Sequence, residues 1–385
     1  MNRKSIMELA RKEIRDITPC VHGGNIWKIA EKHNVEAREI LDFSANLNPL
    51  GPSKKVMEAI YESLWKIPYY PDPECTQLRK SISHYIGEVE PDNVIVGNGS
   101  TELIYLFCEA FIEKGDLALI PTPTFGEYEN AVKKVGGKLA YLKFNGDFKI
   151  DVDLLLEKLT PKVKAIFLCN PNNPTGVLMP KNDALKILER AMEENVLVFV
   201  DEAFIEFVDE EKRYSLAGEV KNHQNLFILR SLTKAFGLAG LRVGYGIACK
   251  DLIDVLSKIK MSWNVNCLAQ AAAISALEDQ EHLKTTQRLI SEERKFLLNE
   301  LGKIKGLKVF PTDANFILMD IRRFGLTAVQ LKEKMLLRGI LVRDCSTFRG
   351  LDEYYVRVSI RTRRENEKLL ASLKETLGPY IKQHD

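Results

Sequence analysis

The most informative residue of the chain is a lysine at the start of a short loop of small residues. Lys234 follows an apolar stretch, Leu226 to Leu229, and Arg242 comes shortly after it. An amine in an enclosed, partly apolar pocket loses solvation, so its pKa falls and it becomes a nucleophile for aldehydes. Arginine offers a fixed cation for a phosphate. Together they indicate pyridoxal phosphate, although a surface lysine and a salt-bridged arginine remain the alternative for these two residues alone.

Two further apolar stretches end in polar residues that suit the same cofactor. Residues 196–200 form a continuous apolar run before Asp201, which is therefore expected at the carboxyl end of a buried parallel strand, where open α/β sheets bind ligands. A carboxylate there can keep a pyridine nitrogen protonated. Residues 163–169 form another run, followed by Asn-Pro-Thr-Gly at 173–176, which by itself would be a turn. These apolar stretches and the polar residues that follow them, taken in this order, are far more specific for the cofactor than any one of them alone.

This order of motifs resembles the fold-type I pyridoxal phosphate enzymes of the aspartate aminotransferase superfamily, nearly end to end. The resemblance implies that Lys234 carries the cofactor aldehyde and Asp201 pairs with the ring nitrogen, so these two are the expected catalytic residues. The other cofactor-binding residues it implies are Gly99, Ser100 and Thr101 at a helix start, Phe125 on the ring, Asn173 at the ring 3-oxygen, Ser231 and Arg242 on the phosphate, and Tyr70 from the neighbouring subunit.

Some of these residues also have plainer interpretations. A helix start preceded by glycines binds anions through its free N–H groups. Read alone, however, residues 97–102 are a weak half of a dinucleotide-binding motif. Tyr70 could equally be a packed aromatic residue of a loop.

Composition and charge exclude several classes of protein. Of the 385 residues, 45% are hydrophobic and 28% charged, and the net charge is +2, which is ordinary globular composition without an electrostatic footprint for nucleic acid or membrane. The seven cysteines are scattered and never spaced as Cys-x-x-Cys, so neither a disulfide framework nor a metal site is expected. The first ten residues are charged and lack an apolar signal region. These features predict a soluble cytoplasmic protein that binds no metal.

Strands and helices alternate along the middle of the chain. The apolar stretches begin near residues 94, 117, 138, 164, 196, 226 and 243, which predicts an α/β fold with a mainly parallel, doubly wound, seven-stranded sheet. Residues 49–267 are expected to form this large cofactor-binding domain. Residues 1–48 and 268–385 are expected to form an N-terminal arm and a smaller α+β domain, with strands near 316–319, 340–342 and 355–360. Residues 1 to about 18 have the spacing of one short amphipathic helix.

Three features favour one branch of the superfamily. The segment His-Gly-Gly-Asn at 22–25, with residues 41–51, resembles the arm of the L-threonine-O-3-phosphate decarboxylases. Phe204 stands where aminotransferases of this group usually have tyrosine. The decarboxylases resemble this chain in having phenylalanine at that position. Arginines follow on the predicted strands of the second domain. The resemblance implies that the substrate is bound by His22, Gly23, Asn46, Asn173, Arg343 and Arg357. Taken singly, His22 is a loop histidine and Arg343 and Arg361 are surface ion pairs.

We therefore expect a homodimeric lyase that decarboxylates a small phosphorylated amino acid, threonine phosphate, to aminopropanol phosphate for cobalamin biosynthesis. The alternative is an aminotransferase of the histidinol-phosphate type, which breaks the Cα–H bond instead. A cofactor-sensing transcription factor would need a basic DNA-binding extension, for which 18 residues before the arm are too few. A serine acyltransferase could be read from Ser231-x-x-Lys234, but its companion motifs are missing.

Overall fold

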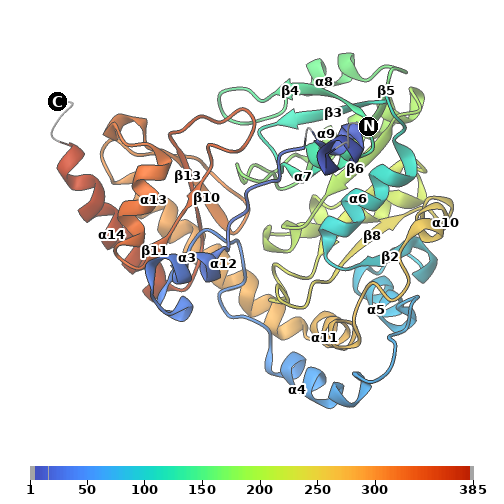
Figure 1. Cartoon of the computed structure of the whole chain (residues 1–385), viewed down its shortest axis with the longest axis horizontal. Helices are drawn as coiled ribbons and strands as arrows, with labels where there is room; N and C mark the ends of the chain where they lie inside the picture. The colour runs from blue at the N-terminus through green and yellow to red at the C-terminus, as the bar shows by residue number, and fades with distance from the viewer. Residues whose placement is uncertain (1–4, 16, 382–385) are drawn as a thin grey trace.

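The large sheet forms the centre of the molecule (Figure 1). The protein is represented by a computed structural model that describes residues 5–15 and 17–381. In spatial order the strands are β2 (Val94–Gly97), β8 (Gly244–Ala248), β7 (Leu226–Ser231), β6 (Leu197–Asp201), β5 (Val163–Cys169), β3 (Leu117–Thr122) and β4 (Lys138–Lys143). Only β8 runs antiparallel to its neighbours. The predicted α/β fold with a mainly parallel seven-stranded sheet is confirmed.

Helices cover both faces of this sheet because successive strand residues point to opposite sides. In β6, Phe199 packs in one apolar cluster, while Val198 and Val200 pack in the other. The first face is covered by α6 (Ser100–Phe111), α7 (Glu127–Lys134) and α10 (Lys250–Ile259). The second is covered by α5 (Thr76–Ile86), α8 (Val152–Lys158), α9 (Lys181–Glu193) and α11 (Cys267–Glu278). Burial on both faces explains why the strands read as continuous apolar runs.

A smaller part of the molecule lies beside the large sheet, to the left in Figure 1. Its antiparallel sheet has the order β12 (Arg343–Asp344), β13 (Tyr355–Ser359), β10 (Phe316–Asp320) and β9 (Lys308–Val309). The helices near it are α12 (Gln280–Gly302), α13 (Ala328–Leu336) and α14 (Arg363–Ile381), with α3 (Ile26–His33) from the N-terminal segment. The short β1 (Leu41–Asp42) pairs in parallel with β11 (Ile340–Leu341). The domain boundaries at residues 49 and 267 stay a prediction. Within the described residues, every helix is too short or too polar to cross a bilayer.

The predicted helix at the N-terminus is wrong for the residues that are described; residues 1–4 and 16 lie outside them. Two four-residue helices, α1 (Ile6–Leu9) and α2 (Lys12–Arg15), are separated at Ala10, whose backbone is extended. The apolar side chains of Ile6 and Leu9 are 81% and 65% exposed. Since this segment buries no apolar face, periodicity alone could not hold one helix together.

The predicted strand at 340–342 is also wrong as a single unit. It is divided between β11, which pairs with β1, and β12, which pairs with β13. The change of partner places Arg343 opposite Arg357 in the four-stranded sheet.

We predict that Gly244→Ala destabilises the protein by about 1–3 kcal/mol, because there is no room for a methyl group. A Cβ atom at this position would lie 2.6 Å from the Ser100 amide nitrogen at the start of α6 and 3.0 Å from the Arg230 carbonyl oxygen. Gly146→Ala is the matched control, since nothing lies within 4 Å of its Cβ position. Urea unfolding measures both. Equal stability of the two variants would show that the β8–α6 approach is not tight.

Candidate active site

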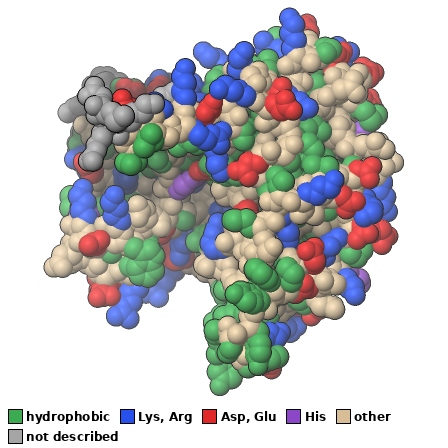
Figure 2. All heavy atoms as spheres, turned by 45° about the vertical axis from the view of Figure 1, so that its right-hand side comes forward, with side chains coloured by type: hydrophobic (Ala, Val, Ile, Leu, Met, Phe, Trp, Pro, Cys, Tyr) green, Lys and Arg blue, Asp and Glu red, His purple; other side chains and the backbone are tan. Residues whose placement is uncertain are grey.

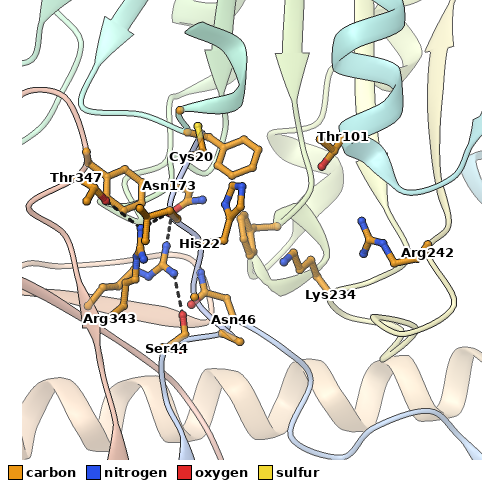
Figure 3. A pocket seen from close by; sticks show the side chains of 18 residues that line it. Cys20, His22, Ser44, Asn46, Thr101, Asn173, Lys234, Arg242, Arg343 and Thr347 are labelled. Carbon is orange, nitrogen blue, oxygen red and sulfur yellow. Dashed lines mark hydrogen bonds between the residues drawn. The ribbon is translucent and has the colours of Figure 1, made fainter. Parts of the chain in front are cut away.

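A cleft of about 350 Å³ opens between the large sheet, the smaller part and the N-terminal segment (Figure 3). Its lining comes from the loops that follow β5, β6 and β7, from the start of α6 and from β12 and β13. Ten sequence-predicted residues line it: His22, Gly23, Asn46, Thr101, Phe125, Asn173, Lys234, Arg242, Arg343 and Arg357. Residues far apart in the sequence thus form one site, as expected for the carboxyl edge of a parallel sheet.

Lys234 lies on the loop that follows β7 and points into the cleft (Figure 3). Burial, together with the guanidinium groups of Arg357 and Arg242, lowers the pKa of the Lys234 amine to about 8, and the Asp201 carboxylate opposes this shift. The amine lies 5.5 Å from the centre of the Phe204 ring. Near neutral pH a substantial fraction of this lysine is therefore uncharged and able to act as a nucleophile or a base.

Asp201 is the last residue of β6 and is buried behind the cleft. Its carboxylate accepts a hydrogen bond of 2.6 Å from the Tyr128 hydroxyl and one of 2.9 Å from the Ala203 amide. Burial raises the pKa of Asp201, while these hydrogen bonds and the nearby Lys234 lower it. A buried carboxylate with two donors is suited to bind a cationic nitrogen, which would supply the missing counter-charge.

One end of the cleft is built to hold a phosphate. Gly99 is the residue before α6, and a Cβ atom there would lie 2.5 Å from the Nη2 atom of Arg242. The φ of Gly99 is +79°, a backbone conformation that favours glycine. Ser231, at the end of β7, is buried, and its hydroxyl lies 2.7 Å from that of Thr233. N–H groups of a helix start, two hydroxyls and an arginine form a set of donors for an anion.

Two more arginines lie at the opposite end of the cleft. Arg357 on β13 is buried, and it donates to the Asn173 side chain and, at 3.2 Å, to the Ser44 carbonyl oxygen. Arg343 on β12 is also buried, and it donates to the Val21 carbonyl oxygen at 2.5 Å and to Thr347 at 3.1 Å. Neither forms an ion pair with a carboxylate in residues 5–15 or 17–381. Burial lowers the pKa of Arg357 to about 10 and lowers that of Arg343.

The N-terminal segment covers part of the cleft. His22 lies 2.7 Å from the Glu127 carboxylate, and its ring is 5.7 Å from that of Phe125. Gly23 has no room for a side chain, since its Cβ would lie 2.2 Å from the Ser44 carbonyl oxygen. Asn46 is buried, and its Oδ1 atom has no hydrogen-bond partner in the described part of the chain. The predicted arm residues are therefore brought together at the cleft.

Five predicted residues do not line the cleft. Four of them lie next to a residue that lines the cleft, either in the sequence or in space: Gly99, Ser100, Asp201 and Ser231. Tyr70 is separate: its side chain is 81% exposed and stacks on Trp263, with 4.6 Å between ring centres. Within a single chain Tyr70 does not reach the site. Arg361, by contrast, pairs with Glu365 at 2.7 Å, so its interpretation as an ion pair is confirmed.

The sequence reasoning missed several residues of this site. Tyr128 holds Asp201, Glu127 holds His22, and Thr347 and Phe348 line the cleft next to Arg343. Tyr128 stands three positions after Phe125 and is the second residue of the helix that begins at Glu127, so its place close to Phe125 in the sequence could have drawn attention to it. Nothing in the sequence pairs residue 22 with residue 127.

Comparison with known proteins agrees with this geometry. Residues 38–373 match the family model for aminotransferase class I and II. The chain belongs to this family. A histidinol-phosphate aminotransferase of Methanosphaera stadtmanae is 37% identical over 96% of this chain and 99% of its own length. A crystal structure described as the histidinol-phosphate aminotransferase from Clostridium acetobutylicum has 34% identity and a TM-score of 0.82, covering 88% of this chain and all of that one.

The comparisons correct the expected reaction. Further curated relatives at 36–37% identity are also named histidinol-phosphate aminotransferase. The L-threonine-O-3-phosphate decarboxylase structure from Porphyromonas gingivalis is more distant, with 28% identity and a TM-score of 0.78 over 87% of this chain and 99% of its own. The interpretation as a threonine-phosphate decarboxylase, a lyase of cobalamin biosynthesis, is therefore wrong. The physical reason is that Phe204 and a pair of arginines fit any substrate with two separated polar groups, and do not determine which bond breaks.

Pyridoxal phosphate is the cofactor of this family member, and the residues present fit it. The helix start at Gly99 lies against the Arg242 guanidinium, so N–H groups and a cation suited to a phosphate stand together. The buried carboxylate of Asp201 suits a protonated ring nitrogen. The charges of Asp201 and Arg242 both influence the pKa of the Lys234 amine, so the three groups lie near one another. The aldehyde, nitrogen and phosphate of the cofactor thus each have a matching group.

We predict that Lys234 in cofactor-free protein titrates near pH 8, as judged by the pH dependence of its acetylation in mass-spectrometric peptide maps. Arg357→Met should raise this midpoint, because a neighbouring cation disfavours the protonated amine and its removal restores the proton. Arg361→Met is the control, since Arg361 is already paired with Glu365. A midpoint near 10.5, or one that Arg357→Met leaves unchanged, would contradict the electrostatic interpretation.

Proposed function

We propose that this chain transfers an amino group between histidinol phosphate and a 2-oxo acid such as 2-oxoglutarate. The observation that carries the proposal is the pair Arg343 and Arg357, two buried guanidinium groups without carboxylate partners in the described part of the chain. Buried cations of this kind are stable only when an anion joins them. The names of the relatives favour the same substrate.

The two arginines suit both substrates in turn. Histidinol phosphate carries a phosphate near its reacting carbon, and 2-oxoglutarate carries a carboxylate there and a second one farther away. The cation of Arg357 contributes to the lowered pKa of Lys234, which indicates that Arg357 lies near the reacting amine. We assign Arg357 to the near anion of each substrate and Arg343, with Thr347, to the distal group.

The cofactor would be held by groups from the large sheet. Residues Gly99–Thr101, Ser231 and Arg242 bind its phosphate, Asp201 binds its ring nitrogen, Asn173 donates to its ring oxygen, and Phe125 packs on its ring. When bound, pyridoxal phosphate supplies an electron-accepting ring that makes the Cα–H bond of the substrate acidic. The 2.6 Å hydrogen bond from Tyr128 helps to keep Asp201 anionic.

Lys234 is the group that moves the proton. With a pKa lowered to about 8, its amine would accept the proton from Cα of the substrate and hold it for a later return at near-neutral pH. Histidinol phosphate has no carboxylate on its reacting carbon, so hydrogen is the group that the enzyme removes. Phe204 and Phe348 line the cleft and reduce the access of water to this step.

We predict that the purified holoenzyme converts 2-oxoglutarate to glutamate only when histidinol phosphate is present, and releases no carbon dioxide. Arg343→Met should raise the KM for 2-oxoglutarate by about tenfold or more, since a charge-assisted hydrogen bond contributes about 1.5–3 kcal/mol. Arg361→Met is again the control. The measurement is a coupled glutamate assay. Failure of the cofactor-loaded protein to form glutamate would contradict the proposed reaction.

We also propose that the enzyme is a homodimer in which Tyr70 serves the partner's site. Apolar side chains that are each more than half exposed gather on α4 (Lys54–Glu62) and the residues after it: Met57, Tyr61, Trp65, Ile67, Tyr69 and Tyr70. Figure 2 shows a hydrophobic projection at the lower edge of the molecule, where Figure 1 places α4. A patch of this kind on a soluble enzyme indicates a protein interface.

The arrangement predicts complementation between two defective variants. Tyr70→Phe subunits mixed with Lys234→Ala subunits should regain activity, because each hybrid dimer has one site with both residues intact. Sedimentation should show a dimer throughout. A fully active monomer, or no gain on mixing subunits that do exchange, would show that Tyr70 has no role across an interface.

A further inference from the structure

The N-terminal segment from Thr18 to Gly24, here called the arm segment, touches both sides of the cleft. On the large side, the Asn130 amide donates at 3.1 Å to the Thr18 carbonyl oxygen and at 3.1 Å to the Cys20 sulfur. On the small side, Arg343 donates to the Val21 carbonyl oxygen, and the Gly24 amide donates to the Ser44 hydroxyl at 2.9 Å. The arm segment therefore bridges the two parts of the molecule beside the substrate site.

Glu127, the first residue of α7, holds this segment through its side chain. One carboxylate oxygen lies 2.7 Å from Nε2 of His22, and the other accepts a 2.6 Å hydrogen bond from the Tyr105 hydroxyl. Glu127 is buried, and no lysine or arginine in the described ranges lies within ion-pair distance of it. The hydrogen bond with His22 is the main cause that lowers the pKa of Glu127, and the one from Tyr105 adds to it.

This contact determines how the His22 ring is presented. An ionised carboxylate can only accept, so Nε2 of His22 must carry the hydrogen, and Nδ1 is left for another partner. The same ring lies 5.7 Å from that of Phe125 in the wall of the cleft. The ring orientation is thus fixed by one hydrogen bond and one aromatic contact, in the manner in which a carboxylate orients a histidine at many sites.

The carboxylate is specific to this position on the helix. Asn130 stands one turn after Glu127 and contacts the same arm segment, so both residues lie on one face of α7. Glu129 points elsewhere, because it pairs with Lys133 at 2.6 Å and with Arg349 at 2.8 Å. The two glutamates of this helix therefore contact different partners. A change at Glu129 can serve as the control for the same change at Glu127.

We infer that Glu127 is a positioning residue that fixes His22 and the arm segment over the distal end of the cleft, and so determines the affinity for the larger amino substrate. The inference rests on the proposed function for the identity of that substrate. Histidinol phosphate carries a polar imidazole ring beyond its reacting carbon, whereas 2-oxoglutarate ends in a single carboxylate that Arg343 can bind. The His22 ring has a free nitrogen and adds a contact for the ring-bearing substrate alone.

The first test uses steady-state kinetics on the holoenzyme. Glu127→Gln should raise the KM for histidinol phosphate about tenfold and change kcat by less than about threefold, because the group acts on binding and not on the proton transfer. The KM for 2-oxoglutarate should change much less. Glu129→Gln, the matched control on the same helix, should leave both constants unchanged. Equal effects of Glu127→Gln on both substrates would overturn the inference.

A double-mutant cycle tests whether Glu127 acts through His22. His22→Ala should have a similar effect on KM, and Glu127→Gln should then add little to it, since interacting residues are not additive. Additive effects would show that Glu127 acts by another route and would contradict the inference.

A second measurement does not depend on the substrate. Hydrogen exchange of the holoenzyme should show faster exchange of the amides in residues 18–24 in Glu127→Gln than in Glu129→Gln or the parent. Unchanged exchange overturns the positioning role whatever the reaction. Faster exchange in an enzyme that fails to use histidinol phosphate supports the positioning role and places the failure in the proposed substrate.

Discussion

The site depends on several cations that share one cleft and that no ion pair with a carboxylate neutralises within residues 5–15 and 17–381. Lys234, Arg242, Arg343 and Arg357 all line one cleft, and Asp201 lies behind it. The pKa values of Lys234 and Arg357 are lowered to about 8 and about 10 because each cation is buried near others. Only ligands with several negative charges can restore the balance. Cofactor and substrate are therefore expected to stabilise the folded state as well as to react in it.

A second set of charged residues lies behind the cleft. It stabilises the end of the sheet that bears these groups. Arg230 on β7 donates to Glu202 at 2.9 Å, to Glu206 at 3.1 Å and to Ser215 at 2.8 Å. Arg230 precedes Ser231, and Glu202 follows Asp201. A buried pair of this kind costs about 3–5 kcal/mol when one partner is removed. Because side chains alternate along a strand, the same two strands present the network on one side and the cofactor-binding groups on the other.

Much of the fold and of the cofactor end of the site could be predicted from the sequence. The strands read as apolar runs because they are buried on both faces, and Asp201, Lys234 and Asn173 follow strands whose carboxyl ends meet. The N-terminal segment could not be predicted in this way. Several of its apolar residues, such as Ile6, Leu9 and Trp27, are exposed. Its contacts, such as His22 with Glu127 and Arg343 with Val21, join residues more than a hundred positions apart. Long-range polar contacts leave no periodic pattern in a sequence.

The reaction was mispredicted for a different physical reason. Phe204 packs on Phe316 with 5.1 Å between ring centres, and the Lys234 amine lies 5.5 Å from the centre of the Phe204 ring. A tyrosine hydroxyl at this position would add one hydrogen bond, with a net contribution of about 0.5–1.5 kcal/mol, or about a tenfold effect on a rate. That is enough to tune a step and too little to choose between breaking a Cα–H bond and losing carbon dioxide.

Arg357 would help to orient the substrate against the cofactor ring, and such orientation favours cleavage of the bond that stands perpendicular to the ring. Arg357 is fixed by Asn173 and the Ser44 carbonyl, one group from each part of the molecule. Its position is therefore a property of how the two parts and the N-terminal segment pack together. Residue identity indicates the machinery, whereas the position of Arg357 depends on this packing as well.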